Sequence, residues 1–195
     1  MWSHSEMKEY LKKKLKKSRY EHSLGVCETA VKLAKMYGEQ EEKSYTAGLI
    51  HDCAKNMTDE EIIKTIEDAG VKIDSLSLKM PQLLHGLAGS IIAGNIMQVK
   101  DKDILNSITY HTTGRENMSL LEKIIYLADY IEPSRDFKGV EELRELSFKD
   151  LDKALLCAYN NSIKFVIEKH EILHLDTIKA RNYLIILSSD TFSSN

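Results

Sequence analysis

The spacing of apolar residues constrains the fold of this chain most strongly. Apolar side chains recur at steps of three and four residues along most of the sequence, and long polar–apolar alternation is absent. Such steps place side chains on one face of an α-helix, whereas a half-buried strand requires alternation. Only two prolines and nine glycines interrupt the 195 residues. The pattern predicts an all-α protein of roughly eight helices and no strand.

Local signals mark several helix ends. Thr58 with Glu61 and Ser119 with Glu122 have the spacing of capping boxes, so we expect a helix to begin after each. Pro133 has no backbone N–H to donate and should end the second of these helices. These signals place helix ends independently of the apolar pattern.

The remaining helices follow from the apolar pattern. Two are expected near 151–170 and 177–187, the latter capped by Asp176 or Thr177. The stretch 85–94 is rich in glycine and alanine, and because glycine is unfavourable inside a helix, these small residues indicate close approach to another helix. The helices together predict one compact bundle.

Chain length favours a single domain over residues 1–195, with a frayed tail at about 188–195. No linker rich in proline, glycine or serine divides the chain, and we find no internal repeat. The length suffices for one substantial core and is short for two.

Composition excludes several classes of protein. The formal net charge of -3 gives no global attraction to nucleic acid or to a membrane surface. No apolar run approaches the ~20 residues that span a bilayer, and the polar N-terminus argues against a secretory signal. The three cysteines lack metal-knuckle spacing and are expected as core residues in a reducing compartment. We therefore expect a cytoplasmic protein with no membrane partner.

A basic run near the N-terminus, from Lys8 to Arg19, has two interpretations. Such a run usually forms one solvated face of a helix. Few aromatic residues interrupt it, so it offers no platform for stacking bases. Nucleic acid is therefore not expected as a partner, although the positive charge could steer an anionic substrate.

The adjacent pair His51-Asp52 is the strongest functional signal. The other residues of the segment 47–54 are small or apolar, and a segment of this kind is normally buried. An unpaired buried carboxylate costs several kcal/mol or takes up a proton. A divalent metal ion would compensate both side chains, because aspartate supplies charge and histidine a nitrogen donor.

Four further polar side chains lie on or beside apolar helix faces: His22, His85, His111 and Asp129. A lone histidine in such a place is usually a hydrogen-bonded core residue. One shared site, however, explains all of these groups together with the His51-Asp52 pair. The pattern therefore favours a single polar site inside the bundle.

We predict that His22, His51, Asp52 and Asp129 bind the metal. Two imidazoles and two carboxylates neutralise a divalent cation and leave positions open for water and substrate. Nitrogen and oxygen donors without thiolate suit iron, manganese or cobalt, and tolerate magnesium or zinc.

The order of these four residues along the chain resembles that of the HD-domain metal-dependent phosphohydrolases, an all-helical superfamily. The segment 110–115, Tyr-His-Thr-Thr-Gly-Arg, and the segment 127–133 followed by Arg135 resemble a subgroup of symmetrical diadenosine-tetraphosphate hydrolases that contain iron. Residues 19–22 and 174–177 are also similar. The resemblance covers nearly the whole chain and implies a compact HD-domain bundle, with iron as the expected metal.

The resemblance also implies site residues. Asp52 and Lys55 are the expected catalytic residues, with Asp52 bridging the metal and the attacking water. The expected nucleotide-binding residues are Arg19, Asp52, Lys55, His85, His111, Thr112, Asp129, Arg135, His174 and Thr177.

Several of these roles have alternatives. Lys55 could be an exposed lysine at a helix end, and Arg135 could form a surface salt bridge. His85 and His111 could hold a second metal ion or bind phosphate. We favour phosphate, because no third carboxylate is evident to neutralise a second ion.

The expected function is therefore metal-dependent, symmetrical hydrolysis of diadenosine tetraphosphate to two ADP. One alternative is an HD phosphohydrolase for other nucleotides. Another is a nucleotide-sensing or nucleic-acid-binding module whose metal is structural. The expected partner is a dinucleoside polyphosphate or a nucleoside diphosphate, and the chain is compatible with a homodimer.

Overall fold

The computed structural model describes residues 1–192, with side chains as far as Ser189, and this part of the chain is all-helical without a strand. The helices are α1 (His4–Lys14), α2 (Lys17–Tyr37), α3 (Glu41–Ile50), α4 (Asp59–Asp68), α5 (His85–Asn95), α6 (Lys102–Tyr110), α7 (Leu120–Ile131), α8 (Val140–Ser147), α9 (Leu151–Glu168) and α10 (Leu175–Phe192). Two short 3₁₀ turns, Ser77–Lys79 and Pro81–Leu83, precede α5. The predicted all-α class is confirmed.

The predicted count of roughly eight helices is too low, for two reasons. The basic N-terminal segment splits into α1 and α2, because Leu15 and Lys16 are extended and the backbone N–H of Lys16 donates to Asn56 Oδ1 at 2.8 Å. The second reason is α8, a short helix that begins after Gly139 in the left-handed region. Helix α8 does have an amphipathic pattern, since Val140, Leu143 and Ser147 are buried at steps of three and four residues, and the sequence analysis missed it.

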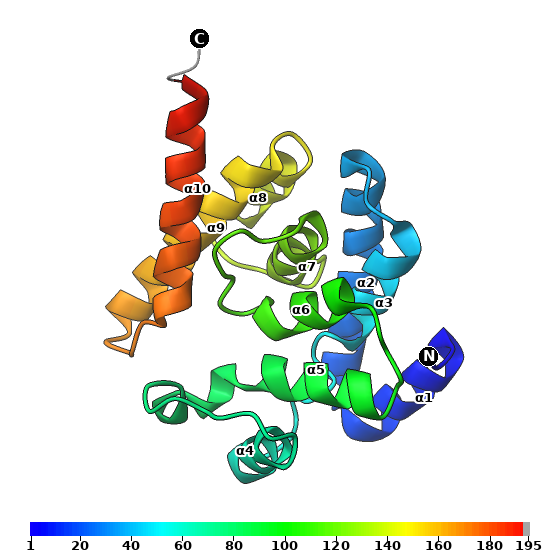
Figure 1. The fold of residues 1–195 in the computed structure, drawn as a ribbon. Coiled ribbons are helices and arrows are strands. Elements are labelled where there is room, and N and C mark those ends of the chain that lie inside the picture. Colours follow the sequence, from blue (N-terminus) through cyan, green and yellow to red (C-terminus); the bar gives the residue numbers. More distant parts are fainter. Residues whose placement is uncertain (193–195) are drawn as a thin grey trace.

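Helix α7 is the central helix of the bundle (Figure 1). It packs against α2, α3, α6, α8 and α9. Its residues Leu121, Ile124, Ile125 and Leu127 have no exposed surface, so the chain on both sides of α7 packs onto one apolar core. The long helices α9 and α10 contact each other and lie side by side in Figure 1.

Two glycines allow the close helix contacts that position the site. A Cβ added at Gly86 would lie 2.6 Å from the carbonyl oxygen of Thr109, and one at Gly48 would lie 3.1 Å from Cys27 Cα. Helices α5 and α6, and likewise α2 and α3, therefore approach at backbone distance. The close approach predicted for residues 85–94 is confirmed, and it brings the beginning of α5 next to the end of α6.

The predicted capping boxes are both formed, at Thr58 with Glu61 and at Ser119 with Glu122. Helix α7 ends at Ile131, directly before the segment that contains Pro133. The local chemistry of these termini was sufficient to place them.

Two other helix ends differ from the prediction. Helix α3 ends at Ile50, so the His51-Asp52 pair lies in the turn that follows and not inside a helix. The prediction of Asp176 or Thr177 as the cap of the last helix is wrong. Helix α10 begins at Leu175, and Nδ1 of His174 accepts a hydrogen bond from the Asp176 backbone N–H at 3.2 Å.

The last helix is also longer than predicted, since α10 continues to Phe192. Residues 193–195 of the predicted frayed tail lie outside the described residues. Among the described residues, no helix is both long and apolar enough to cross a membrane.

Candidate metal and phosphate site

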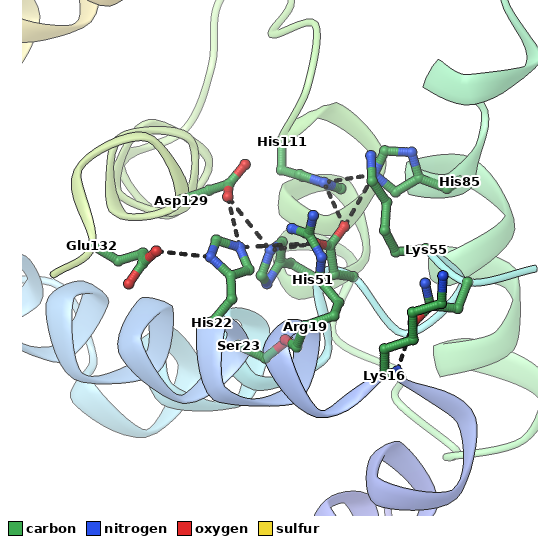
Figure 2. Close-up of polar contacts among 12 residues, drawn as sticks. Lys16, Arg19, His22, Ser23, His51, Lys55, His85, His111, Asp129 and Glu132 are labelled. Carbon is green, nitrogen blue, oxygen red and sulfur yellow. Dashed lines mark hydrogen bonds and ion pairs between the residues drawn. The ribbon is translucent and has the colours of Figure 1, made fainter. Parts of the chain in front are cut away.

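Three of the four predicted metal ligands, His22, His51 and Asp129, lie together in Figure 2, and Asp52 lies beside His22 and His51. His22 comes from α2, His51 and Asp52 from the turn after α3, and Asp129 from α7. His22 Nε2 lies 2.9 Å from Asp129 Oδ1, and His51 Nε2 lies 3.4 Å from Asp52 Oδ2. His51 Nε2 and Asp129 Oδ1 are 3.8 Å apart. Residues separated by more than a hundred positions thus lie together, and these four are called the ligand cluster below. Among the described residues, the donor atoms close enough to share one ion form two overlapping groups, His22 with His51 and Asp129, and His51 with Asp52 and His111.

Hydrogen bonds at the outer ring nitrogens orient the two imidazoles. His51 Nδ1 lies 2.8 Å from the carbonyl oxygen of Gly48. A carbonyl can only accept, so Nδ1 carries the proton and the lone pair of Nε2 faces the cluster. His22 Nδ1 lies 2.9 Å from the carboxylate of Glu132, which selects the same tautomer. This arrangement is the one that metal-binding histidines adopt.

The inner atoms of the cluster are left without hydrogen bonds. His22 Nε2, His51 Nε2 and Asp52 Oδ1 are buried, and none has a hydrogen-bond partner among the described residues. An unsatisfied buried polar atom costs about 1–3 kcal/mol. The atoms without partners are imidazole nitrogens and a carboxylate oxygen, which are the ligand types that divalent cations accept, so the residues present fit a divalent cation.

The charges inside the cluster stabilise the ionised carboxylates. Burial would raise the pKa of Asp52, but His51, His111 and His85 beside it outweigh burial and hold that pKa well below its usual range. Burial likewise opposes ionisation of Asp129, yet His22, His51 and Arg135 lower its pKa. Both groups are therefore anionic at neutral pH and ready to bind a cation.

A second group of imidazoles continues from the cluster. His85 Nδ1 and His111 Nδ1 each lie 2.7 Å from a backbone carbonyl oxygen, of Gln82 and Ile108 respectively. Both rings therefore direct the Nε2 lone pair inward, where the two Nε2 atoms are 3.1 Å apart. Two lone pairs at this distance repel each other, and burial, with His111 and Lys55 nearby, lowers the pKa of His85. The pair is therefore suited to accept hydrogen bonds from a ligand.

Asp52 joins the two groups of histidines. Its Oδ1 lies 3.1 Å from His85 Nε2 and 3.4 Å from His111 Nε2, whereas its Oδ2 faces His51 and Arg19. One carboxylate therefore contributes to both sides of the site.

Three cationic side chains border the cluster. Arg19 donates to Asp52 Oδ2 at 2.8 Å, and Arg135 donates to Asp129 Oδ1 at 2.6 Å. Lys55 is half-buried, and its Nζ lies 3.4 Å from His85 Nε2. Burial lowers the pKa of Lys55. Lys55 is thus not the exposed helix-end lysine of the alternative interpretation, and Arg135 pairs with a carboxylate of the site.

The three remaining predicted residues lie farther out. Thr112 follows His111, and its buried Oγ1 has no hydrogen-bond partner among the described residues. His174 lines a separate pocket of about 320 Å³ together with Tyr110 and Thr113. Thr177 is buried in the first turn of α10, and the structure does not place it against the ligand cluster.

The sequence analysis missed Glu132. Its side chain is buried and accepts from the backbone N–H of Ser134 at 2.8 Å in addition to its contact with His22. A Cβ added at Gly25 would lie 2.6 Å from Glu132 Oε2, so the glycine leaves room for this carboxylate. The sequence signal that could have identified this residue is its position, one turn after Asp129 and directly before Pro133, where the helix ends.

A match to the family model described as HD domain spans residues 19–134. The matched range is more than half of the chain and contains all four residues of the ligand cluster. The fold and the site therefore define the class: this chain belongs to the HD domain family.

The names of individual relatives are more specific than the name of the family. A protein of Halalkalibacterium halodurans named bis(5'-nucleosyl)-tetraphosphatase, symmetrical, is 39% identical over 90% of this chain and 94% of its own length. A protein of the same name from Bacillus subtilis is also 39% identical, over 90% of this chain and 94% of its own length.

A solved structure extends the similarity to three dimensions. The crystal structure of a predicted HD superfamily hydrolase involved in NAD metabolism, from Clostridium acetobutylicum, is 54% identical with a TM-score of 0.94. The match covers 95% of this chain and 98% of the other. The arrangement of helices described above is therefore shared by a close relative.

Proposed function

We propose that this protein hydrolyses diadenosine tetraphosphate symmetrically to two molecules of ADP, with a divalent metal ion in the ligand cluster. The observation that carries the proposal is the convergence of His22, His51, Asp52 and Asp129, with inner donor atoms left unpaired and cationic side chains at both ends. The names of the relatives support the substrate.

The reaction adds one water molecule across the central P–O–P bond. The oxygen of water bonds to one inner phosphorus, and the bridging oxygen leaves with the other ADP. The two protons go to the new terminal oxygens or, above the pKa values of those oxygens, to solvent. A bound divalent cation supplies polarisation of a phosphoryl oxygen and activation of water.

The protein's own residues supply binding and orientation. Arg19, Lys55 and Arg135 neutralise phosphate oxygens, and the planar guanidinium groups suit paired oxygens. Because the pKa of Asp52 is held well below its usual range, this carboxylate is a weak base and acts by orienting water. Phosphoryl transfer depends mainly on such positioning and charge neutralisation.

For the metal we propose iron. Two imidazoles and two carboxylates without thiolate suit Fe²⁺, and they also accept manganese, cobalt or magnesium. Elemental analysis of the purified protein, followed by reconstitution of the metal-stripped protein with each ion, tests this choice. Iron as the most abundant bound metal and the most activating ion is the expected result.

The test of the reaction is chromatography of the products. ADP alone is expected from diadenosine tetraphosphate. ATP with AMP would show asymmetric cleavage, and tight binding without turnover in any metal would favour the sensor. Assembly as a homodimer and a cytoplasmic location stay predictions.

A further inference from the structure

A pocket of about 520 Å³ opens beside Asp129. Its lining residues come from the end of α7, the segment after it, and α9: Asp129, Tyr130, Arg135, Phe137, Lys138, Asn161 and Phe165. In Figure 2, Asp129 lies at one end of the site, and His85 and Lys55 lie at the other. The pocket therefore adjoins the end of the ligand cluster opposite His85, and it is called the α7–α9 pocket below.

The walls of this pocket are aromatic. The rings of Tyr130 and Phe137 meet edge to face, with centroids 5.3 Å apart and an interplanar angle of 82°. Phe165 faces the same space from α9 and is 56% exposed. A single exposed phenylalanine is ordinary on a protein surface. Three aromatic residues from three segments around one pocket form a surface suited to a flat aromatic ring.

Polar groups accompany the rings. The amide nitrogen of Asn161 makes a long, 3.9 Å contact with Cys157 Sγ, a weak interaction that a ligand can replace. An amide group offers one donor and one acceptor side by side, which matches the N6 and N7 edge of adenine. Lys138 adds an exposed positive charge at the rim.

A path for phosphates connects the pocket to the cluster. A neighbouring pocket of about 360 Å³ is lined by Arg19, His22 and Arg135, and it shares Arg135 and Phe137 with the α7–α9 pocket. Two guanidinium groups therefore border the space between the ligand cluster and the aromatic walls. This charge complements a diphosphate.

We propose that the α7–α9 pocket binds the purine base of the second nucleoside of the substrate. The inference rests on the proposed function. Symmetrical cleavage requires the middle of the tetraphosphate to lie at the ligand cluster, so the two nucleosides must extend from it in different directions. The α7–α9 pocket lies on the Asp129 side, and the other nucleoside extends past Lys55, His85 and His111.

The test compares two substrates in two variants. Phe165→Ala removes a ring that is already exposed and so spares the core. Ile167→Ala is the matched control, because it truncates a residue of the same helix that is 58% exposed and does not line the pocket. The substrates are diadenosine tetraphosphate and adenosine 5'-tetraphosphate, which has only one nucleoside. Metal content and thermal unfolding are measured for each variant.

Phe165→Ala is expected to lower kcat/KM for diadenosine tetraphosphate about tenfold, the usual effect of losing one base-stacking ring. Its kcat/KM for adenosine 5'-tetraphosphate should stay at the wild-type value, and Ile167→Ala should match the wild type on both substrates. Equal values for Phe165→Ala and wild type on both substrates, or an equal loss on both, would overturn the assignment of the pocket.

The same assays distinguish a failure of the proposed function from a failure of the base pocket. A metal-loaded wild-type protein that does not cleave diadenosine tetraphosphate would overturn the proposed function and this inference together. An active wild type with an unaffected Phe165→Ala variant would overturn the base pocket alone.

Discussion

Glu132→Gln should weaken metal binding although Glu132 is not a predicted ligand. The wild-type carboxylate accepts from His22 Nδ1 at 2.9 Å and from the Ser134 backbone N–H at 2.8 Å. A glutamine amide has one oxygen and one NH₂ group, so it cannot accept at both places. Either the NH₂ opposes the Ser134 N–H, or it opposes His22 Nδ1 and forces the imidazole proton onto Nε2, where the metal should bind.

The expected loss of metal affinity can be estimated from the role of Glu132 as the carboxylate that orients His22. Removing the carboxylate that orients a metal-binding histidine costs about 10- to 100-fold in metal affinity, which corresponds to about 1.4–2.7 kcal/mol. The burial of Glu132, which is only 1% exposed, supports a value within this range, because a buried side chain has little contact with solvent that could replace the lost acceptor. The assay is competition of the metal-stripped protein with a chromophoric chelator for Mn²⁺ or Co²⁺, both of which resist oxidation in air.

Glu122→Gln is the matched control. Glu122 is also fully buried, at the other end of α7, and accepts from Arg115 Nε at 2.9 Å. This variant should lose stability and keep its metal affinity. If Glu132→Gln also unfolds at a lower temperature but binds Mn²⁺ as tightly as the wild type, then Glu132 is a structural residue and the orienting role is refuted.

Four further outcomes are expected. Asp129→Ala should abolish metal binding and turnover together, whereas Arg135→Ala should raise KM or lower kcat with metal content intact; inductively coupled plasma analysis beside steady-state kinetics separates the two. Removing the metal with a chelator should lower the midpoint of thermal unfolding, because an ion at 1,000 times its Kd stabilises the native state by about 4 kcal/mol. Burial raises the pKa of the Cys27 thiol to about 12, so Cys27 should stay unmodified by iodoacetamide at pH 8. The partly exposed Cys157 should be modified, and peptide mass spectrometry distinguishes the two.

Helix positions were predictable where the signal was local. The capping boxes at Ser119 and Thr58 and the stop at Pro133 depend on residues within one turn of each other, and the structure has all three. The break between α1 and α2 was not predictable in this way. It depends on a hydrogen bond from Lys16 to Asn56, forty positions away, and no pattern within one helix contains that information.

The convergence of the ligand cluster was predictable because burial restricts charge. Asp52 and Asp129 lie in apolar segments of the sequence, and a carboxylate that is buried with such a segment requires compensating partners. The contact of Glu132 with His22 was harder to predict from the sequence. It depends on the space left at Gly25 and on the direction of the chain after Pro133. The distances of the cationic residues from the carboxylates likewise depend on tertiary packing.

The adjacency of His51 and Asp52 follows from the geometry of the site. Oδ2 of Asp52 faces His51 Nε2 and Arg19, whereas Oδ1 faces His85 and His111. Both carboxylate oxygens are therefore committed, one on each side. An asparagine would place an NH₂ group, which can only donate, on one of those sides, and a glutamate would displace both oxygens by one methylene. A single aspartate in the turn after α3 thus connects the other residues of the ligand cluster to the half of the site nearer Lys55. This position explains why the most constrained residue in the sequence also lies at the centre of the site.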